Sequence, residues 1–279
     1  MDKHDLYELC VQSPRHLALF LRELHGNNPV ALREDFCGTA YLSRRWVAEG
    51  LKRGDDARAV ATDLDPDALA RARREADHAG IPLSRLHLLH ADATTPAPPP
   101  HIDPELWDAP ADVVFVGNFS IGYIFDRPTL LNYLRRSHAR LARGGGGWGG
   151  GIFVCDTYGG SNAYKTGVAS QRTHVGRRGE IVTYTWEHVS ADPITATVEN
   201  AIHFRVREKD EITADFPAAF TYRWRLWTIP ELRDAMHEAG FTSTAVYARL
   251  TTAPGEPPEP VRDPGELDDN WVVCVVGRL

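Results

Sequence analysis

Small and acidic side chains recur between residues 34 and 120 in a pattern suited to one polar ligand. Gly38 falls between an expected strand and an expected helix, where a tight turn lets backbone approach a ligand and the start of the helix offers unpaired N–H groups. Asp63 ends the next apolar run, and a carboxylate there can accept hydrogen bonds from both hydroxyls of a ribose. Asp92 follows the third run and suits an exocyclic amino group such as that of adenine. With residues 118–120 after the fourth run, the ordered set predicts one adenosine-sized site.

Short apolar runs alternate with amphipathic helices over residues 30–156. These patterns predict strands at 30–36, 58–63, 86–91, 112–117 and 152–156, and helices at 40–49, 66–79 and 128–142. Asp65, ahead of Pro66, is the expected cap of the second of these helices. Elements in this order build a doubly wound, mostly parallel sheet, and the carboxyl ends of its strands meet at one edge, where ligands bind.

Residues outside this alternation predict three additions within a single domain of residues 1–279. Two helices, the second starting at Ser13-Pro14, form an N-terminal cover over residues 1–28. Residues 160–227 carry strand-like alternation at 180–189, 195–207 and 219–227 and predict an antiparallel β insertion. A helix at 230–239 and strands at 242–250 and 270–277 complete a sheet of seven strands. The glycine-rich run 144–151 follows a helix and precedes a strand, the reverse of a phosphate-binding loop, so we interpret it as a connector.

Composition excludes several classes of protein. Thirty-one basic against 38 acidic residues give a formal net charge of −7, the wrong sign for general attraction to nucleic acid. No apolar stretch is long enough to cross a bilayer, and the N-terminus is too polar for a signal peptide, so a cytoplasmic protein is expected. The four cysteines show no CxxC spacing and the histidines no HxxxH spacing, so reduced thiols and no metal site are predicted.

The segment Glu34-Asp35-Phe36-Cys37-Gly38-Thr39-Ala40 resembles the first motif of the class I S-adenosylmethionine-dependent methyltransferases, which reads acid-x-Gly-x-Gly-x-Gly. Phe36 and Ala40 replace two of the glycines. The resemblance runs from about residue 30 to the C-terminus, through Leu141-Ala142-Arg143-Gly144-Gly145 and the final strand. It implies a Rossmann-like methyltransferase fold and S-adenosyl-L-methionine as the cofactor. The residues that it assigns to the cofactor are Glu34, Phe36, Cys37, Gly38, Thr39, Ala40, Asp63 and Leu64 for the first two strands, Asp92 and Ala93 for the third, and Asn118, Phe119 and Ser120 beside the methyl-transfer position. Arg15 is a candidate for the methionine carboxylate, against the alternative of a solvated helix face.

The insertion resembles in layout the lid of small-molecule methyltransferases of the glycine N-methyltransferase and sugar N,N-dimethyltransferase kind. The expected reaction is direct displacement, which depends on alignment and on exclusion of water, so a dedicated general base is optional. Substrate-side candidates close to a strand end or on the insertion are Tyr7, Gln12, Asn118, Tyr123, Tyr158, Arg172 and His174; each could instead be an ordinary packing residue. Trp186, Trp224 and Trp227 are interpreted as core of the insertion.

Three alternatives compete with a methyltransferase acting on the nitrogen or oxygen of a small molecule. A nicotinamide-dependent dehydrogenase would share the doubly wound sheet, but the turn at Gly38 has only one glycine of the Gly-x-Gly-x-x-Gly pattern. A non-catalytic S-adenosylmethionine-binding sensor or partner subunit needs only the nucleotide half of the site. An RNA or protein methyltransferase is disfavoured by the net charge. The acceptor and the oligomeric state, a homodimer included, are left open by the sequence.

Overall fold

A computed structural model describes residues 1–144, 150–209, 211–248 and 252–279, and these divide into two compact units. The first, here called the sheet unit, comprises Pro14–Thr157, Trp227–Leu267 and Val272–Leu279. The second, the insertion unit, comprises Met1–Ser13, Tyr158–Leu226 and Asp268–Trp271. The two N-terminal helices expected as one cover over residues 1–28 therefore fall in different units.

The sheet unit is built on a seven-stranded sheet in the order β10-β11-β5-β4-β1-β2-β3. The strands β1, β2, β3, β4 and β5 are parallel to one another, and β10 is antiparallel to β11. Chain order reverses between β1 and β4, which are neighbours in the sheet, and open α/β sheets bind ligands at such a switch point. The strands span Ala31–Asp35 (β1), Arg58–Asp63 (β2), Leu86–His90 (β3), Val113–Val116 (β4), Ile152–Tyr158 (β5), Ser243–Tyr247 (β10) and Val272–Arg278 (β11).

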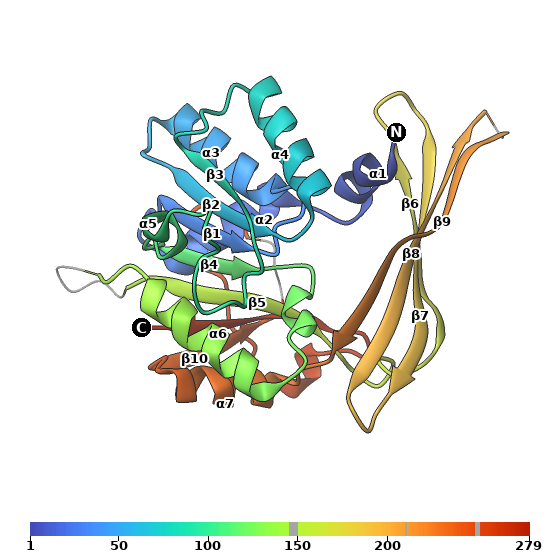
Figure 1. Cartoon of the computed structure of the whole chain (residues 1–279). Coiled ribbons are helices and arrows are strands. Elements are labelled where there is room, and N and C mark those ends of the chain that lie inside the picture. The colour runs from blue at the N-terminus through green and yellow to red at the C-terminus, as the bar shows by residue number, and fades with distance from the viewer. Residues whose placement is uncertain (145–149, 210, 249–251) are drawn as a thin grey trace. The chain divides into compact units, whose positions relative to one another are not determined.

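Several helices of the sheet unit, which Figure 1 labels, begin at a residue whose side chain caps them, whereas Ala40 before α3 makes no such bond. Asp65 caps α4 by accepting from the N–H groups of Asp67 and Ala68, as predicted, and Thr228 forms a capping box with Glu231 at the start of α7. Helices α2, α3 and α4 pack in succession, and α6 packs on α7. The helices span Pro14–His25 (α2), Tyr41–Arg53 (α3), Pro66–His78 (α4), Pro104–Trp107 (α5), Arg127–Arg140 (α6) and Ile229–Ala239 (α7).

The insertion unit is a four-stranded antiparallel sheet with helix α1 (Lys3–Cys10) packed on one of its faces. Its strands are β6 (Gly167–Val175), β7 (Ile181–Asp192), β8 (Thr197–Glu208) and β9 (Glu211–Arg225). Side chains alternate between the two faces, and Leu6 of α1 packs with Val182, Ile202 and Phe204 on one of them. The antiparallel insertion is thus present.

Most expected elements are present, and the differences have local causes. The strand β6 was not predicted, because its sequence GVASQRTHV is largely polar, and on this edge strand seven of the nine residues are exposed and the other two are only partly buried. The short helix α5 and a 3₁₀ turn at Ser120–Tyr123 were also missed. The strand expected at 242–250 ends at Tyr247; residues 249–250, and 145–149 of the glycine-rich run, lie outside the described residues. Among the described helices none is long and apolar enough to span a membrane.

Candidate active site

The turn after β1 keeps a glycine-like backbone at positions that are not glycine. Phe36, Gly38 and Ala40 have φ angles of +58°, +54° and +50°. These are the three positions at which the resembled motif carries glycine, so two ordinary residues adopt the left-handed conformation, at a cost of about 1–2 kcal/mol each. A Cβ built on Gly38 would meet nothing within 4 Å, so open space faces the backbone there. The turn can therefore receive a ligand close to its main chain.

Asp63 connects this turn to the end of β2. Its carboxylate accepts hydrogen bonds from the N–H of Gly38 (2.6 Å) and from the N–H of Asp65 (2.8 Å), and the N–H of Cys37 donates to the carbonyl of Thr62 (3.0 Å). Burial raises the pKa of Asp63 above its usual value. Each carboxylate oxygen has further acceptor capacity, so the same group can bind the hydroxyls of a ligand while it holds the turn. Leu64, next in the chain, is 62% exposed and offers apolar surface beside it.

Glu34 links β1 to the helix that follows the turn. Its carboxylate is buried and accepts from the N–H (2.9 Å) and the hydroxyl (2.5 Å) of Ser43 in the first turn of α3. Burial raises the pKa of Glu34 to about 7, although the bonds from Ser43 lower it. The residue predicted to bind the cofactor therefore fixes the helix that follows the turn.

Glu34→Gln is expected to change how stability depends on pH. A carboxyl whose pKa is raised in the folded state stabilises the fold below its unfolded pKa of 4.5, and that stability is lost as pH rises through about 7. Between pH 4.5 and 7.5 the free energy of unfolding of the wild type should therefore fall by about 3 kcal/mol more than that of the glutamine variant. Urea unfolding of both proteins across this range measures the difference, in which other titrating groups cancel. Parallel curves for the two proteins would contradict the assignment.

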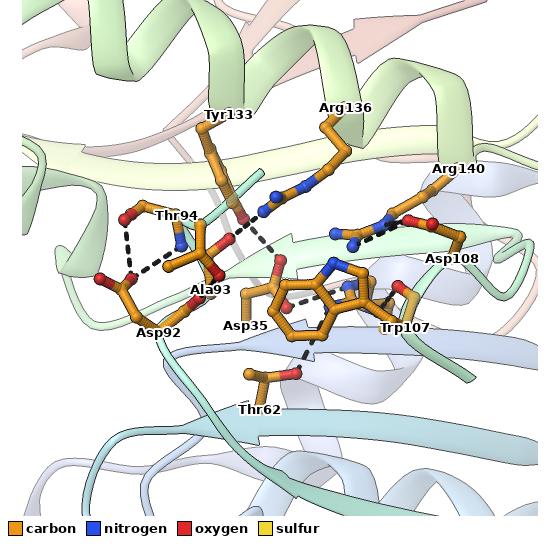
Figure 2. Close-up of polar contacts among 12 residues, drawn as sticks. Asp35, Thr62, Asp92, Ala93, Thr94, Trp107, Asp108, Tyr133, Arg136 and Arg140 are labelled. Atoms are coloured by element: carbon orange, nitrogen blue, oxygen red, sulfur yellow. Dashed lines mark hydrogen bonds and ion pairs between the residues drawn. The ribbon is translucent and has the colours of Figure 1, made fainter. Parts of the chain in front are cut away.

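The end of β3 leads into a turn that folds around Asp92. One carboxylate oxygen of Asp92 accepts from the N–H (2.8 Å) and the hydroxyl (2.7 Å) of Thr94, and the hydroxyl of Thr95 donates to the carbonyl of Asp92 (2.8 Å). Ala93 is buried, and its carbonyl accepts from Arg136 of α6. Figure 2 shows these groups on one side of the network around Trp107. The turn is thus held both by its own side chains and by α6.

The turn after β4 has a strained backbone, and an acid that the sequence analysis did not identify accepts hydrogen bonds from it. Asn118 and Phe119 have φ angles of +55° and +62°. Asp156, in β5, accepts from the N–H of Asn118 (2.9 Å) and from the N–H of Phe119 (2.6 Å). Burial raises the pKa of Asp156 to about 7. The sequence signal available was an acid at the end of the fifth apolar run, the same signal that identified Asp63.

Aromatic rings join the first and fourth strand ends. The ring of Phe36 stacks on Tyr123 (centroids 6.2 Å apart, 20° between planes) and meets Tyr133 of α6 edge-on (6.3 Å, 65°). Tyr123 is 42% exposed, so part of its side chain is accessible to a ligand or solvent. Phe36, at a position where the resembled motif has glycine, therefore positions a substrate-side candidate.

Within the insertion unit most of the remaining candidates lie beside one aromatic face of the sheet. The hydroxyl of Tyr158 accepts from Asn200 Nδ2 (3.1 Å), and its ring meets Trp186 and Trp224 edge-on at 6.3 and 6.5 Å. His174 and Arg172 lie on β6 opposite Val182 and Tyr184, so they share this face, His174 partly buried and Arg172 exposed. Tyr7 packs against Phe220 at 5.0 Å, and Gln12 follows α1. Trp224 is buried in the insertion unit, as expected, and Trp186 is partly buried against its apolar cluster. Trp227 belongs instead to the sheet unit and donates from Nε1 to the carbonyl of Ile124 (2.8 Å).

Most of the predicted cofactor residues gather at the carboxyl edge of the sheet. The residues near the first turn and the end of β2 contact one another directly, and those after β4 are tied to β5. Ser120 is buried at the start of the 3₁₀ turn, and Thr39 accepts through its carbonyl from Arg44 Nε (3.1 Å). Arg15 lies exposed in the first turn of α2, and its role stays a prediction. No group of three potential metal ligands occurs among the described residues.

Solved structures share this fold over nearly the whole chain. An S-adenosylmethionine-dependent methyltransferase from Clostridium acetobutylicum is 16% identical with a TM-score of 0.65, covering 99% of this chain and 97% of that one. The sugar N-methyltransferase KedS8 from Streptoalloteichus is 17% identical with a TM-score of 0.61, covering 99% and 92%. An amino pentose methyltransferase from Micromonospora echinaspora, solved with S-adenosylmethionine bound, is 16% identical with a TM-score of 0.63, covering 99% and 96%.

At these identities the comparisons speak for the fold. The chain has the Rossmann-like fold of S-adenosylmethionine-dependent methyltransferases with an antiparallel β insertion, as the sequence predicted. A scan of family models and a search of curated proteins found no match.

Proposed function

We propose that this protein transfers a methyl group from S-adenosyl-L-methionine to a nitrogen or oxygen of a small-molecule acceptor. The observation that carries the proposal is the turn after β1, in which all three motif positions keep a left-handed backbone and Gly38 is held against Asp63. A backbone held in this strained form, with open space beside Gly38, is what close approach to a ligand requires. The fold, shared with methyltransferases of sugars and other small molecules, supports the same reading.

The strand ends supply a donor and acceptor set that fits this cofactor. Asp63 would accept from the ribose hydroxyls, and Asp92 from the amino group of adenine, with Leu64 covering the base. The main chain from Phe36 to Ala40 and the Asn118–Ser120 turn would line the methionine side. The cofactor supplies an electrophilic methyl group on a sulfonium when it is bound.

The protein's part in the reaction is to orient the acceptor and to exclude water. Asn118 and Tyr123 would hold the acceptor on the sheet unit, and the substrate-side roles of Tyr158 and His174 stay predictions. Asp156 is already committed to two backbone N–H groups, which favours holding the turn over accepting the proton of the acceptor. An amine acceptor needs only to arrive uncharged, so alignment and water exclusion are sufficient catalysis.

Calorimetry and a product screen test the proposal. S-adenosylhomocysteine and S-adenosylmethionine should bind and NAD should not, and mass spectrometry should detect methylated product from a panel of amino sugars, small amines and phenols. Binding of NAD without S-adenosylhomocysteine would contradict the cofactor assignment. Cofactor binding with no product across the panel, together with a cofactor-dependent protein partner, would identify a sensor instead.

A further inference from the structure

Three arginines, two of them buried and the third, Arg136, partly buried, lie around Trp107 in the sheet unit (Figure 2). The guanidinium carbons of Arg33, Arg136 and Arg140 lie 5.4, 5.2 and 5.0 Å from the centroid of the indole ring, which is fully buried. Arg33 is itself only 1% exposed and Arg140 only 2%. Removing a cation from water is costly unless it has an acceptor, so the acceptors of each arginine indicate what that arginine does.

Two of the three arginines face a carboxylate. Arg33 donates from Nε to Asp35 Oδ1 (3.0 Å) and from Nη1 to the carbonyl of Trp107 (2.9 Å). Arg140 donates from Nε to Asp108 Oδ1 (3.1 Å). These contacts tie α5 to β1 and to the end of α6. They serve the framework of the sheet unit and do not touch a predicted cofactor residue.

Arg136 uses a different acceptor. Its Nη2 donates to the main-chain carbonyl of Ala93, the residue directly after Asp92. Since Asp92 and Thr94 fold the turn on itself, a hold on the Ala93 carbonyl fixes the turn relative to α6 and the sheet. Burial lowers the pKa of Arg136, and the negative charge of Asp35 opposes that shift. Arginine is charged in proteins, and a charged donor strengthens a hydrogen bond to a carbonyl.

Tyr133 lies one helical turn before Arg136 on the same face of α6. Its hydroxyl donates to Asp35 Oδ2 (2.8 Å), and its ring contacts Phe36. One face of α6 therefore holds the turn after β1 through Tyr133 and the turn after β3 through Arg136. These two turns are the ones assigned above to the methionine and adenine ends of the cofactor.

We propose that Arg136 is a positioning residue for recognition of the base: by holding the Ala93 carbonyl it sets the Asp92 carboxylate to accept from a 6-amino group and to reject a 6-oxo group. This rests on the proposed cofactor. A carboxylate in place discriminates strongly, because the 6-oxo group offers an acceptor where a donor is required, so the partly buried carboxylate gains no bond to the base. A turn free to shift loses that discrimination.

The test compares S-adenosylhomocysteine with S-inosylhomocysteine, in which oxygen replaces the 6-amino group, by calorimetry on the full-length protein. The wild type should prefer the adenosine compound by at least about thirtyfold. Arg136→Met keeps the apolar stem beside the indole and loses the donor, and the preference should fall by about tenfold or more. Arg136→Lys restores one donor and should recover part of the preference, and it serves as a second variant should the methionine variant fail to fold.

Arg140→Met is the matched control, because it removes a guanidinium from the same helix and the same indole but not from the turn. It should lower the melting temperature and leave the preference for the adenosine compound unchanged. An unchanged preference in folded Arg136 variants would overturn the proposal and leave Arg136 a purely structural residue. Wild-type protein that binds S-adenosylhomocysteine without preferring it would overturn the base-recognition role alone, whereas no binding of either compound would reject the proposed function as well.

Discussion

Replacing Asp63 with alanine is expected to weaken the binding of S-adenosylhomocysteine by at least about thirtyfold. The carboxylate would lose a pair of charge-assisted hydrogen bonds to the ribose, worth on the order of 2–4 kcal/mol. It would also release the N–H of Gly38, which it now holds at 2.6 Å, so the turn that approaches the ligand would no longer be fixed. Isothermal titration with the purified, folded variant measures the affinity.

Asp65→Ala is the matched control for this prediction. Asp65 is two residues away, and its side chain caps α4 through the N–H groups of Asp67 and Ala68 at 2.9 and 3.2 Å. Its loss should lower stability by about 1 kcal/mol and leave the affinity within about twofold. An Asp63→Ala variant that folds and binds as tightly as the wild type would show that Asp63 only shapes the turn.

Local sequence signals were sufficient to predict most elements of the sheet unit. The strands β4 and β5 are largely apolar, and β1, β2 and β3 combine apolar residues with polar ones. The caps at Asp65 and at the start of α7 are formed by neighbours within three residues. Residues that follow such strands meet at one edge for topological reasons, which is why Gly38 and Asp63 could be paired from sequence.

Interactions between distant segments could not be predicted in the same way. Asp156 accepts from the main-chain N–H groups of Asn118 and Phe119, which precede it by 38 and 37 positions. The residues next to Asp156 in the sequence give no sign of these partners. Arg33 and Asp35 read as polar positions of a strand, yet they are buried and paired, with α5 and α6 supplying their other partners. Left-handed backbone at Phe36 and Ala40 was likewise hidden, because neither residue is glycine.

The left-handed turns and the acids bonded to them act together. The turns after β1 and β4 each contain two residues other than glycine with positive φ. An acid accepts a hydrogen bond from the main chain of each turn: Asp63 in the first and Asp156 in the second. Strained backbone persists only where its surroundings over-determine it. The acids therefore stabilise left-handed backbone at the ligand edge of the sheet, a conformation that glycine in the resembled motif adopts without steric cost.

Asp156→Ala is accordingly expected to reduce turnover much more than cofactor binding. The change would leave the N–H groups of Asn118 and Phe119 without their acceptor, lowering stability by about 2–4 kcal/mol, and the left-handed pair would relax. A shift of about 1 Å at residues that align the acceptor can cost about a hundredfold in rate, so turnover at saturating cofactor should fall by at least that factor. The adenosine contacts assigned to Asp63 and Asp92 lie on other turns, so the affinity for S-adenosylhomocysteine should fall by less than about tenfold.

Asp112 supplies the control that separates turnover from stability. Its Oδ2 also accepts two backbone N–H groups, those of Val30 (2.8 Å) and Ala31 (2.9 Å), but at the start of β1, the end of the strand away from the site. Asp112→Ala should therefore lower the free energy of unfolding by a similar amount while turnover of the remaining folded enzyme stays near the wild-type value. Equal losses of turnover in the two variants would show that Asp156 contributes stability alone. If Asp156 positions Asn118 and Phe119, turnover should fall in Asp156→Ala but not in Asp112→Ala. Asp156→Asn should be intermediate, because the amide keeps one acceptor oxygen.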